Sequence, residues 1–229
     1  MGTVPLEELS FSSGLAKAVV LRDVQQHDVT GPVVVVNLAG SDAFVGQGQP
    51  SALPAFSSTI LHGGSVTGAL LALLSVELFQ EGEQIARNLG WDDFYGAGPG
   101  RPVLLRSAQD TLGTVQLEPS TVLHQPGLPP GERVFTVKAN LWFSPAGTDC
   151  GIHNQHDFIE IHTQIFGFGR MQKFSSLDHG SLYEDQLLSP GNTNPVPFCL
   201  EQDGAFSYPW HQYRADTDCI WLALEYHPS

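Results

Sequence analysis

The sequence predicts a mainly β protein, an antiparallel sandwich or jelly roll that follows an N-terminal extension with one or two helices. The chain of 229 residues contains 24 Gly and 16 Pro along with frequent Val, Thr and Phe, a composition that favours short strands and tight turns. After Arg101, about eight short apolar or alternating segments follow one another, separated by turn sequences. Before Arg101 the apolar pattern differs, and part of it has near-helical spacing.

The first hundred residues mix several patterns. Leu15 to Leu21 suits either a helix or a first strand, and Val33 to Val36 is a β-branched run that predicts a buried strand. Residues 39–64 are rich in Gly, Pro and small residues and predict a loop. From Thr67 to Leu89 leucines recur at near-helical spacing, which predicts one helix, or two divided at Gly82.

The turn-rich stretch Trp91 to Pro102 marks the boundary between two parts of the chain. We expect an α/β extension over residues 1–100 and a β domain over residues 101–229. The extension is expected to pack against the β domain, where it covers one rim or forms a homodimer contact.

In the β domain, each expected strand is an apolar or alternating run bounded by Gly, Pro or Asn. The expected strands are Val103 to Arg106, Gly113 to His124, Val134 to Phe143, Phe158 to Phe166, Met171 to Phe174, Leu182 to Leu188, Val196 to Leu200 and Cys219 to Tyr226.

Composition limits the classes of partner. With 10 Lys plus Arg against 24 Asp plus Glu, the net charge of −14 repels nucleic acid and anionic membrane surfaces. The longest apolar run, Val66 to Phe79, contains Glu77 and is shorter than the roughly 20 residues of a membrane span. Three cysteines are too few for a disulfide framework, and the first ten residues show no secretion signal. These features predict a cytoplasmic protein that has neither nucleic acid nor a membrane as a partner.

The segment from Cys150 to Arg170 concentrates side chains that bind metals. On an extended strand Glu160, His162 and Gln164 point to one face, which is costly in a core unless they serve a ligand, a metal or one another. His156 lies near the start of this strand and can turn toward the same point. Imidazole and carboxylate ligands suit Fe(II), Mn(II), Zn(II) or Ni(II).

This segment resembles the first motif of the cupin superfamily, in which a His-x-His pair precedes a glutamate and a glycine. Here Glu160 follows His156 after three residues and precedes Gly167 by six, while Asn154 stands where the family has its first histidine. The second cupin motif ends in a strand histidine preceded by proline, and Pro209-Trp210-His211 is similar to it.

The resemblance implies a cupin-type β-barrel over residues 101–229 that holds a divalent transition metal, with Fe(II) preferred over Zn, Mn or Ni. It implies His156, Glu160 and His211 as ligands. Asn154, His153 or His162 completes the set, and we favour His162 because it shares the inner face with Glu160. A metal-free cupin is the remaining alternative.

The implied function is a metal-dependent enzyme that acts on a small organic substrate inside the barrel. Among such cupins we expect a non-heme Fe(II) oxygenase, in which Gln164 or Tyr213 orients the substrate. A second hypothesis is an isomerase, epimerase or lyase with His162 or His211 as the base and Tyr208 or Tyr213 as the acid. A third is a non-catalytic binding module.

Each candidate also has a purely structural interpretation. His156 and Glu160 can form a surface pair, His162 and Gln164 a hydrogen-bonded pair in the core, and His211 can pack in an aromatic turn. The spacing of Cys150, His153 and His156 also imitates part of a zinc site.

Overall fold

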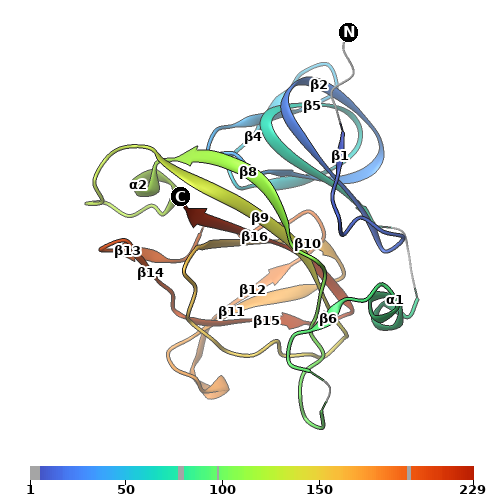
Figure 1. Ribbon diagram of the computed structural model, residues 1–229, viewed down its shortest axis with the longest axis vertical. Helices are drawn as coiled ribbons and strands as arrows, with labels where there is room; N and C mark the ends of the chain where they lie inside the picture. The colour runs from blue at the N-terminus through green and yellow to red at the C-terminus, as the bar shows by residue number, and fades with distance from the viewer. Residues whose placement is uncertain (1–5, 77–79, 97, 195–196) are drawn as a thin grey trace.

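The computed structural model describes residues 6–76, 80–96, 98–194 and 197–229. The predicted mainly β class is confirmed, since the chain folds into antiparallel sheets (Figure 1). The N-terminal sheet has the strand order β1-β2-β5-β3-β4. Its strands are β1 (Glu7–Glu8), β2 (Ala16–Asn37), β3 (Ala43–Gly46), β4 (Ser51–Leu53) and β5 (Ser58–Val76).

The two long strands β2 and β5 wrap around each other, as the blue and teal ribbons of Figure 1 show. Val34 of β2 is paired with Ile60 near the start of β5 and also with Leu74 near its end. Register shifts interrupt β2 on either side of Gly31, whose φ of 85° suits glycine. The predicted strand at Val33 to Val36 is therefore the last part of a longer, curled strand.

The helix predicted from Thr67 to Leu89 is wrong for its first part, because β5 continues to Val76. Leu70 and Leu74 face the main core and Leu71 and Leu73 face a second apolar cluster, so both faces of this strand are buried. A strand buried on both sides is apolar throughout and imitates helical spacing. Helix α1 (Gly82–Asn88) accounts for the later part, and residues 77–79 lie outside the described ranges.

The predicted loop over residues 39–64 is also wrong in part, because it contains β3, β4 and the first residues of β5. The strand predicted from Gly113 to His124 ends at Leu117, and Pro119 then begins the short helix α2 (Pro119–Val122). Proline lacks the N–H group that a strand ladder needs but is well suited to the first turn of a helix.

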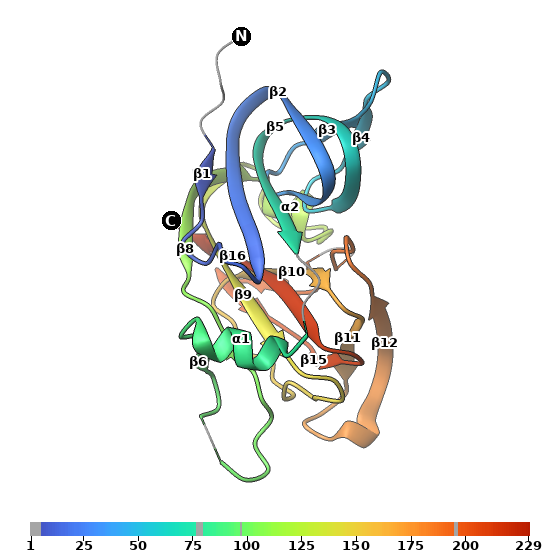
Figure 2. The same ribbon diagram turned by 90° about the vertical axis from the view of Figure 1, so that its right-hand side faces the viewer.

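The remaining strands form a sandwich. The larger sheet has the order β10-β16-β9-β7-β6, with β8 also paired to β9, and a three-stranded sheet β12-β11-β15 forms a second layer (Figure 2). A hairpin of β13 and β14 adds to these. The bounds are β6 (Asp92–Asp93), β7 (Leu105–Arg106), β8 (Asp110–Leu117), β9 (Arg133–Ser144), β10 (Ile159–Phe166), β11 (Gly169–Phe174), β12 (Leu182–Leu188), β13 (Leu200–Gln202), β14 (Ala205–Ser207), β15 (Trp210–Ala215) and β16 (Cys219–Pro228).

The closed barrel expected from the cupin resemblance is not formed by the described strands. The two sheets stay separate, and isolated bridges join each of them to a loop, as His153 is bridged to His211 of β15 and Thr193 to Thr163 of β10. They pack through a small core in which Met171 and Tyr213 of one sheet meet Trp221 of the other. Strand β15 contains His211, as expected from the second motif, although apolar patterning did not predict this strand. The strand expected from Val196 to Leu200 shares only Leu200 with β13 within the described residues.

A continuous apolar core joins the N-terminal sheet to the outer face of the larger sheet. Tyr226 of β16 lies in this core, where its hydroxyl donates to the carbonyl of Leu38 at 3.0 Å and its ring meets Phe56 edge-on at 5.3 Å. The domain boundary near residue 100 stays a prediction. None of the described helices is long and apolar enough to cross a bilayer.

Tyr226→Phe removes one buried hydrogen-bond donor and leaves the Leu38 carbonyl without it, so we expect unfolding free energy to fall by about 1 kcal/mol. Tyr226→Ala also removes the ring and should cost about 3–5 kcal/mol. Urea denaturation followed by circular dichroism measures both. Tyr183→Phe is the control, because Tyr183 is 57% exposed, and equal effects at the two positions would contradict the assignment.

Candidate metal centre

The candidate centre lies between the two layers and is assembled from three parts of the chain. Glu160 and His162 point inward from β10, and His211 points inward from β15, where it is fully buried. His153 and His156 come from the loop before β10. This loop is held against β15 because the N–H of each of His153 and His211 donates to the other's carbonyl, at 2.9 and 2.8 Å.

Three histidines, His153, His156 and His211, have ligand atoms within 4.8 Å of one another. The Nε2 atoms of His156 and His211 are 3.3 Å apart, and Oε2 of Glu160 lies 3.6 Å and 3.7 Å from them. Bonds of about 2.1 Å to one ion place neighbouring ligand atoms roughly 3.0–3.5 Å apart. The separation of His156 and His211 lies in this range and the other separations are somewhat longer, so a single divalent ion fits after small inward movements of these side chains.

Backbone carbonyls fix the orientation of two of the imidazoles. Nδ1 of His153 is 3.0 Å from the carbonyl oxygen of Gly151, and Nδ1 of His211 is 2.9 Å from that of Pro209. When Nδ1 carries the proton and donates it to the carbonyl, Nε2 keeps its lone pair for a metal. This arrangement is typical of metal-binding histidines.

Glu160 supplies an independent test of the fit. Its Oε2 is buried and has no hydrogen-bond partner among the described residues, which is costly for a carboxylate oxygen. Burial by itself would raise the pKa of this carboxyl, but the neighbouring imidazoles, His162 above all, lower it well below its usual value. An ionised carboxylate with one unused buried oxygen is well suited to a cation.

His153 and His156 stay neutral because they are buried. Burial lowers the pKa of His156 to about 4, even though the charge of Glu160 opposes this shift. Burial, followed by the proximity of His211, also lowers the pKa of His153. Neutral imidazole is the form that binds metals, so the site is prepared for a cation at mildly acidic pH.

His162 lies outside the three-histidine group of the described residues. Its Nε2 is 3.2 Å from Oε1 of Glu160, the oxygen on the other side of that carboxylate, and its ring stacks on Tyr213 at 4.1 Å. Neither ring nitrogen has a hydrogen-bond partner in the described part of the chain. The structure thus places His153 closer to the candidate ion position than sequence reasoning favoured, and leaves His162 beside it.

The other predicted residues divide between the centre and its surroundings. Tyr213 borders the cavity, and the amide of Asn194 donates to its hydroxyl. Gln164 is fully buried and its Nε2 donates to the carbonyl of Phe166 at 2.6 Å, so it is turned away from the histidines. Cys150 borders the cavity but is not part of the histidine group, and burial raises the pKa of its thiol to about 12.

Tyr208 contacts the backbone at the start of β10 and does not face the cavity. Its hydroxyl accepts from the N–H of Glu160 and donates to the carbonyl of Phe158, both at 2.8 Å. Burial raises the pKa of this phenol, so it stays protonated and able to donate. The structure therefore gives Tyr208 the role of fixing the start of β10.

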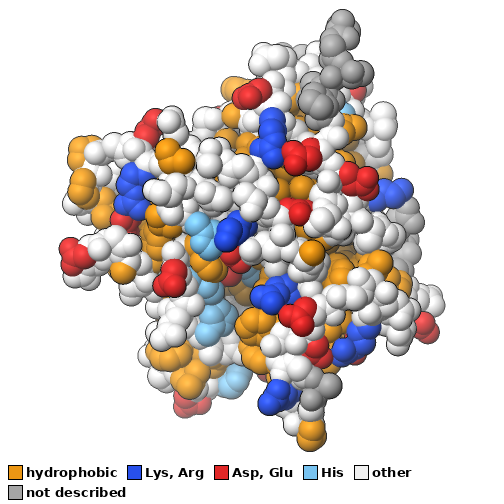
Figure 3. All heavy atoms as spheres, in the orientation of Figure 1, with side chains coloured by type: hydrophobic (Ala, Val, Ile, Leu, Met, Phe, Trp, Pro, Cys, Tyr) orange, Lys and Arg blue, Asp and Glu red, His pale blue; other side chains and the backbone are white. Residues whose placement is uncertain are grey.

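A cavity of about 510 Å³ opens from the centre. Several histidine side chains reach the face of the molecule that Figure 3 shows. This volume is in the range of about 300–1,000 Å³ that is usual for small-molecule sites. Sequence reasoning missed the part of its wall that comes from the turn-rich linker and β7. The walls away from the metal centre include Phe94, Tyr95, Leu104, Arg106, Trp142, Phe158, Trp221 and Glu225.

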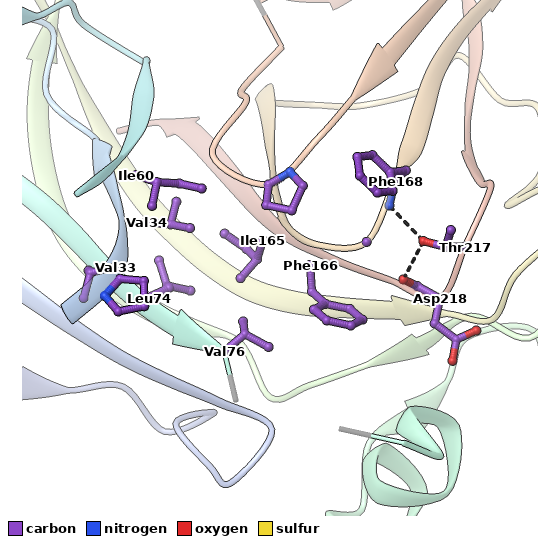
Figure 4. A pocket seen from close by; sticks show the side chains of 13 residues that line it. Val33, Val34, Ile60, Leu74, Val76, Ile165, Phe166, Phe168, Thr217 and Asp218 are labelled. Carbon is purple, nitrogen blue, oxygen red and sulfur yellow. Dashed lines mark hydrogen bonds between the residues drawn. The ribbon is translucent and has the colours of Figure 1, made fainter. Parts of the chain in front are cut away.

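A second cavity of about 570 Å³ lies between the N-terminal sheet and the end of β10 (Figure 4). Val34, Leu74 and Ile165 point into it, so its walls are mainly apolar. Near Phe168, the hydroxyl of Thr217 accepts from a backbone N–H at 2.9 Å. Because histidines do not line this cavity, it is separate from the candidate centre.

Comparison with known proteins gives limited similarity. No protein-family model matches the chain, and no curated protein matches it. Among solved structures, a DMSP lyase structure has a TM-score of 0.29 and 17% identity, and the alignment covers 40% of this chain and 38% of that one. Oxalate decarboxylase from Bacillus subtilis at pH 4.6 has a TM-score of 0.33 and 14% identity over 93% of this chain and 68% of that one. Scores below 0.5 define no shared chemistry, so the candidate centre must be interpreted from its own geometry.

His211→Ala removes the most deeply buried candidate ligand. We expect the affinity for Mn(II) or Fe(II) to fall by at least about 10–100-fold, because a loss of that size already follows when only the hydrogen-bond partner of a metal ligand is removed. Equilibrium dialysis with elemental analysis measures it. His62→Ala is the matched control, since His62 is exposed in β5. Unchanged metal binding in His211→Ala would contradict the proposed ligand set.

Metal binding should persist when the pH falls below 6.5, where an ordinary imidazole protonates, and should be lost toward pH 4. The direction of this pH dependence follows from the lowered pKa of His156. Protons compete with the metal only at a pH near or below that pKa, where the ring becomes protonated. Metal content after dialysis across this pH series tests it. Release of the metal with a midpoint near pH 6.5 would show that burial does not lower the pKa of His156.

Proposed function

We propose that this chain is a metal-dependent enzyme of the cupin type that acts on a small organic molecule in the cavity beside the metal centre. The observation that carries the proposal is the unpartnered, buried Oε2 of Glu160, which faces the Nε2 atoms of His156 and His211 at 3.6 and 3.7 Å. His153 completes the set. Mn(II), Fe(II), Zn(II) and Ni(II) all suit these ligands, and Fe(II) is our first choice.

A divalent ion held by His153, His156, His211 and Glu160 would supply Lewis-acid chemistry toward an oxygen atom of the substrate. The residues of the chain supply the remaining functions. The carbonyls of Gly151 and Pro209 hold the histidines in place, and Tyr208 fixes the backbone at Glu160. Aromatic walls exclude water from the substrate, which strengthens electrostatic interactions in the cavity.

His162 is the residue that we assign to proton transfer. It lines the cavity, has no hydrogen bond on either ring nitrogen among the described residues, and is positioned by stacking on Tyr213. An imidazole with a free ring nitrogen can take a proton from a substrate carbon or oxygen. This chemistry belongs to a lyase or isomerase, which we place first.

A non-heme Fe(II) oxygenase is the second candidate function. His153, His156, His211 and Glu160 would hold an iron ion with fewer protein ligands than it can accept, and the ion would then supply oxygen-activating chemistry. The two candidates differ in their need for oxygen, so a direct experiment separates them.

The test is turnover of a panel of small organic acids by protein loaded with Mn(II) or Fe(II), with and without air. We expect turnover without oxygen, and a loss of about 10²–10⁴ in kcat for His162→Gln with metal content unchanged. Gln186→Ala, on the exposed edge strand β12, is the control. Oxygen-dependent turnover would favour the oxygenase, and failure to bind any transition metal would overturn the proposal as a whole.

A further inference from the structure

A row of paired side chains crosses the larger sheet on the face that carries the metal centre. In β10, Gln164 pairs with Trp221 of β16, which pairs with Trp142 of β9. The row continues through Arg106 of β7 to Asp92 of β6. Directly paired residues in antiparallel strands point to the same face, and so do residues two positions apart along one strand. Arg106 therefore shares a face with Glu160 and His162.

The guanidinium of Arg106 is held at the wall of the cavity by two aromatic rings. It lies 5.5 Å from the ring of Trp142 and 5.6 Å from that of Phe94. One nitrogen, Nη2, donates to Oδ2 of Asp92 at 3.1 Å, and Asp92 is 68% exposed on its side chain. An ion pair this exposed contributes little, so the guanidinium can bind another carboxylate.

Arg106 is the only Lys or Arg among the described residues that border this cavity. The acidic side chains there are already engaged, because Glu160 belongs to the candidate centre and Glu225 is 2.8 Å from Nε2 of His227. The chain as a whole carries a net charge of −14, which disfavours anions at its surface. A positively charged group at this position is thus a local exception that favours a negatively charged ligand.

Trp221 provides a second group without a partner. Its ring lines the same cavity, and its Nε1 is buried and has no hydrogen-bond acceptor among the described residues. A buried N–H group without an acceptor is costly, and a ligand oxygen would satisfy it. The cavity thus offers one charged and one neutral donor on aromatic walls.

We propose that the substrate is a small organic acid, with its carboxylate on Arg106 and its apolar body against Trp142 and Phe94. Arg106 is a specificity-determining residue in this assignment. The planar fork of a guanidinium matches a carboxylate, and the two rings hold the fork in position. The inference rests on the proposed function only in placing the reacting end of the acid at the metal centre.

Binding of 3-phenylpropionate and its neutral amide tests this assignment. Quenching of tryptophan fluorescence reports binding, since Trp142 and Trp221 line the cavity, and calorimetry confirms the affinity. We expect the protein to prefer the carboxylate by about tenfold or more, a difference of about 1.4 kcal/mol. In Arg106→Gln the preference should fall to about one, and Arg106→Lys should give an intermediate value because it keeps the charge without the fork.

Arg22→Gln is the matched control. Arg22 and Arg106 have side-chain exposures of 40% and 39%, and each pairs with an exposed carboxylate, but Arg22 lies in the N-terminal sheet. Its substitution should leave the preference unchanged. Circular dichroism and thermal unfolding of each variant show whether it is folded. If Arg106→Gln does not fold, the carboxylate preference of Arg106→Lys against the parent protein decides.

Three outcomes would overturn the assignment: equal affinity for acid and amide, no binding of either at millimolar concentration, or an unchanged preference in Arg106→Gln. Each measurement is made on metal-free and on Mn(II)-loaded protein. A preference that depends on Arg106 in a protein that binds no metal would support the anion site while rejecting the proposed enzyme. Metal binding without such a preference would support the proposed enzyme and reject the anion site.

Discussion

The burial of a charged carboxylate at Glu160 is the constraint on which the rest of the site depends. This side chain lies inside a sandwich of apolar strands, where an unpaired charge would be strongly destabilising. His162 approaches one of its oxygens, while His156 and His211 approach the other without a hydrogen bond to it. The folded chain has therefore arranged ring nitrogens around a negative charge, and this arrangement is suited to a cation.

The two layers of the sandwich each supply part of this centre. The larger sheet contributes Glu160 and His162, and the smaller sheet contributes His211. A loop contributes the other histidines and is fixed by a bridge between the backbones of His153 and His211. Because the candidate ligands come from both layers, the centre depends on the packing between them, and this packing includes Tyr213 and Trp221.

The N-terminal half of the chain serves the site indirectly. Its curled sheet covers the outer face of the larger sheet, and Tyr226 hydrogen-bonds across this contact to Leu38. The outer face of the larger sheet supplies the main core. Its inner face is therefore free to carry the polar residues of the site. The linker after α1 adds Phe94 and Tyr95 to the cavity wall, so the site extends beyond the strands that resemble the cupin motifs.

The sequence by itself determined the mainly β class and the inward face of β10, because strand periodicity places Glu160 and His162 together whatever the rest of the chain does. It also indicated His156 and His211 as further candidate metal ligands, because the short segments around them resemble the two cupin motifs. Tertiary structure decided that Leu70 to Leu74 form a strand, since burial on both faces erases the alternation that distinguishes a strand from a helix. Tertiary structure also brought His153 to the centre, through a backbone bridge to a strand more than fifty residues away, and Arg106 to the cavity wall, through cross-strand pairing. Contacts between distant segments depend on sheet register, which short sequence patterns do not encode.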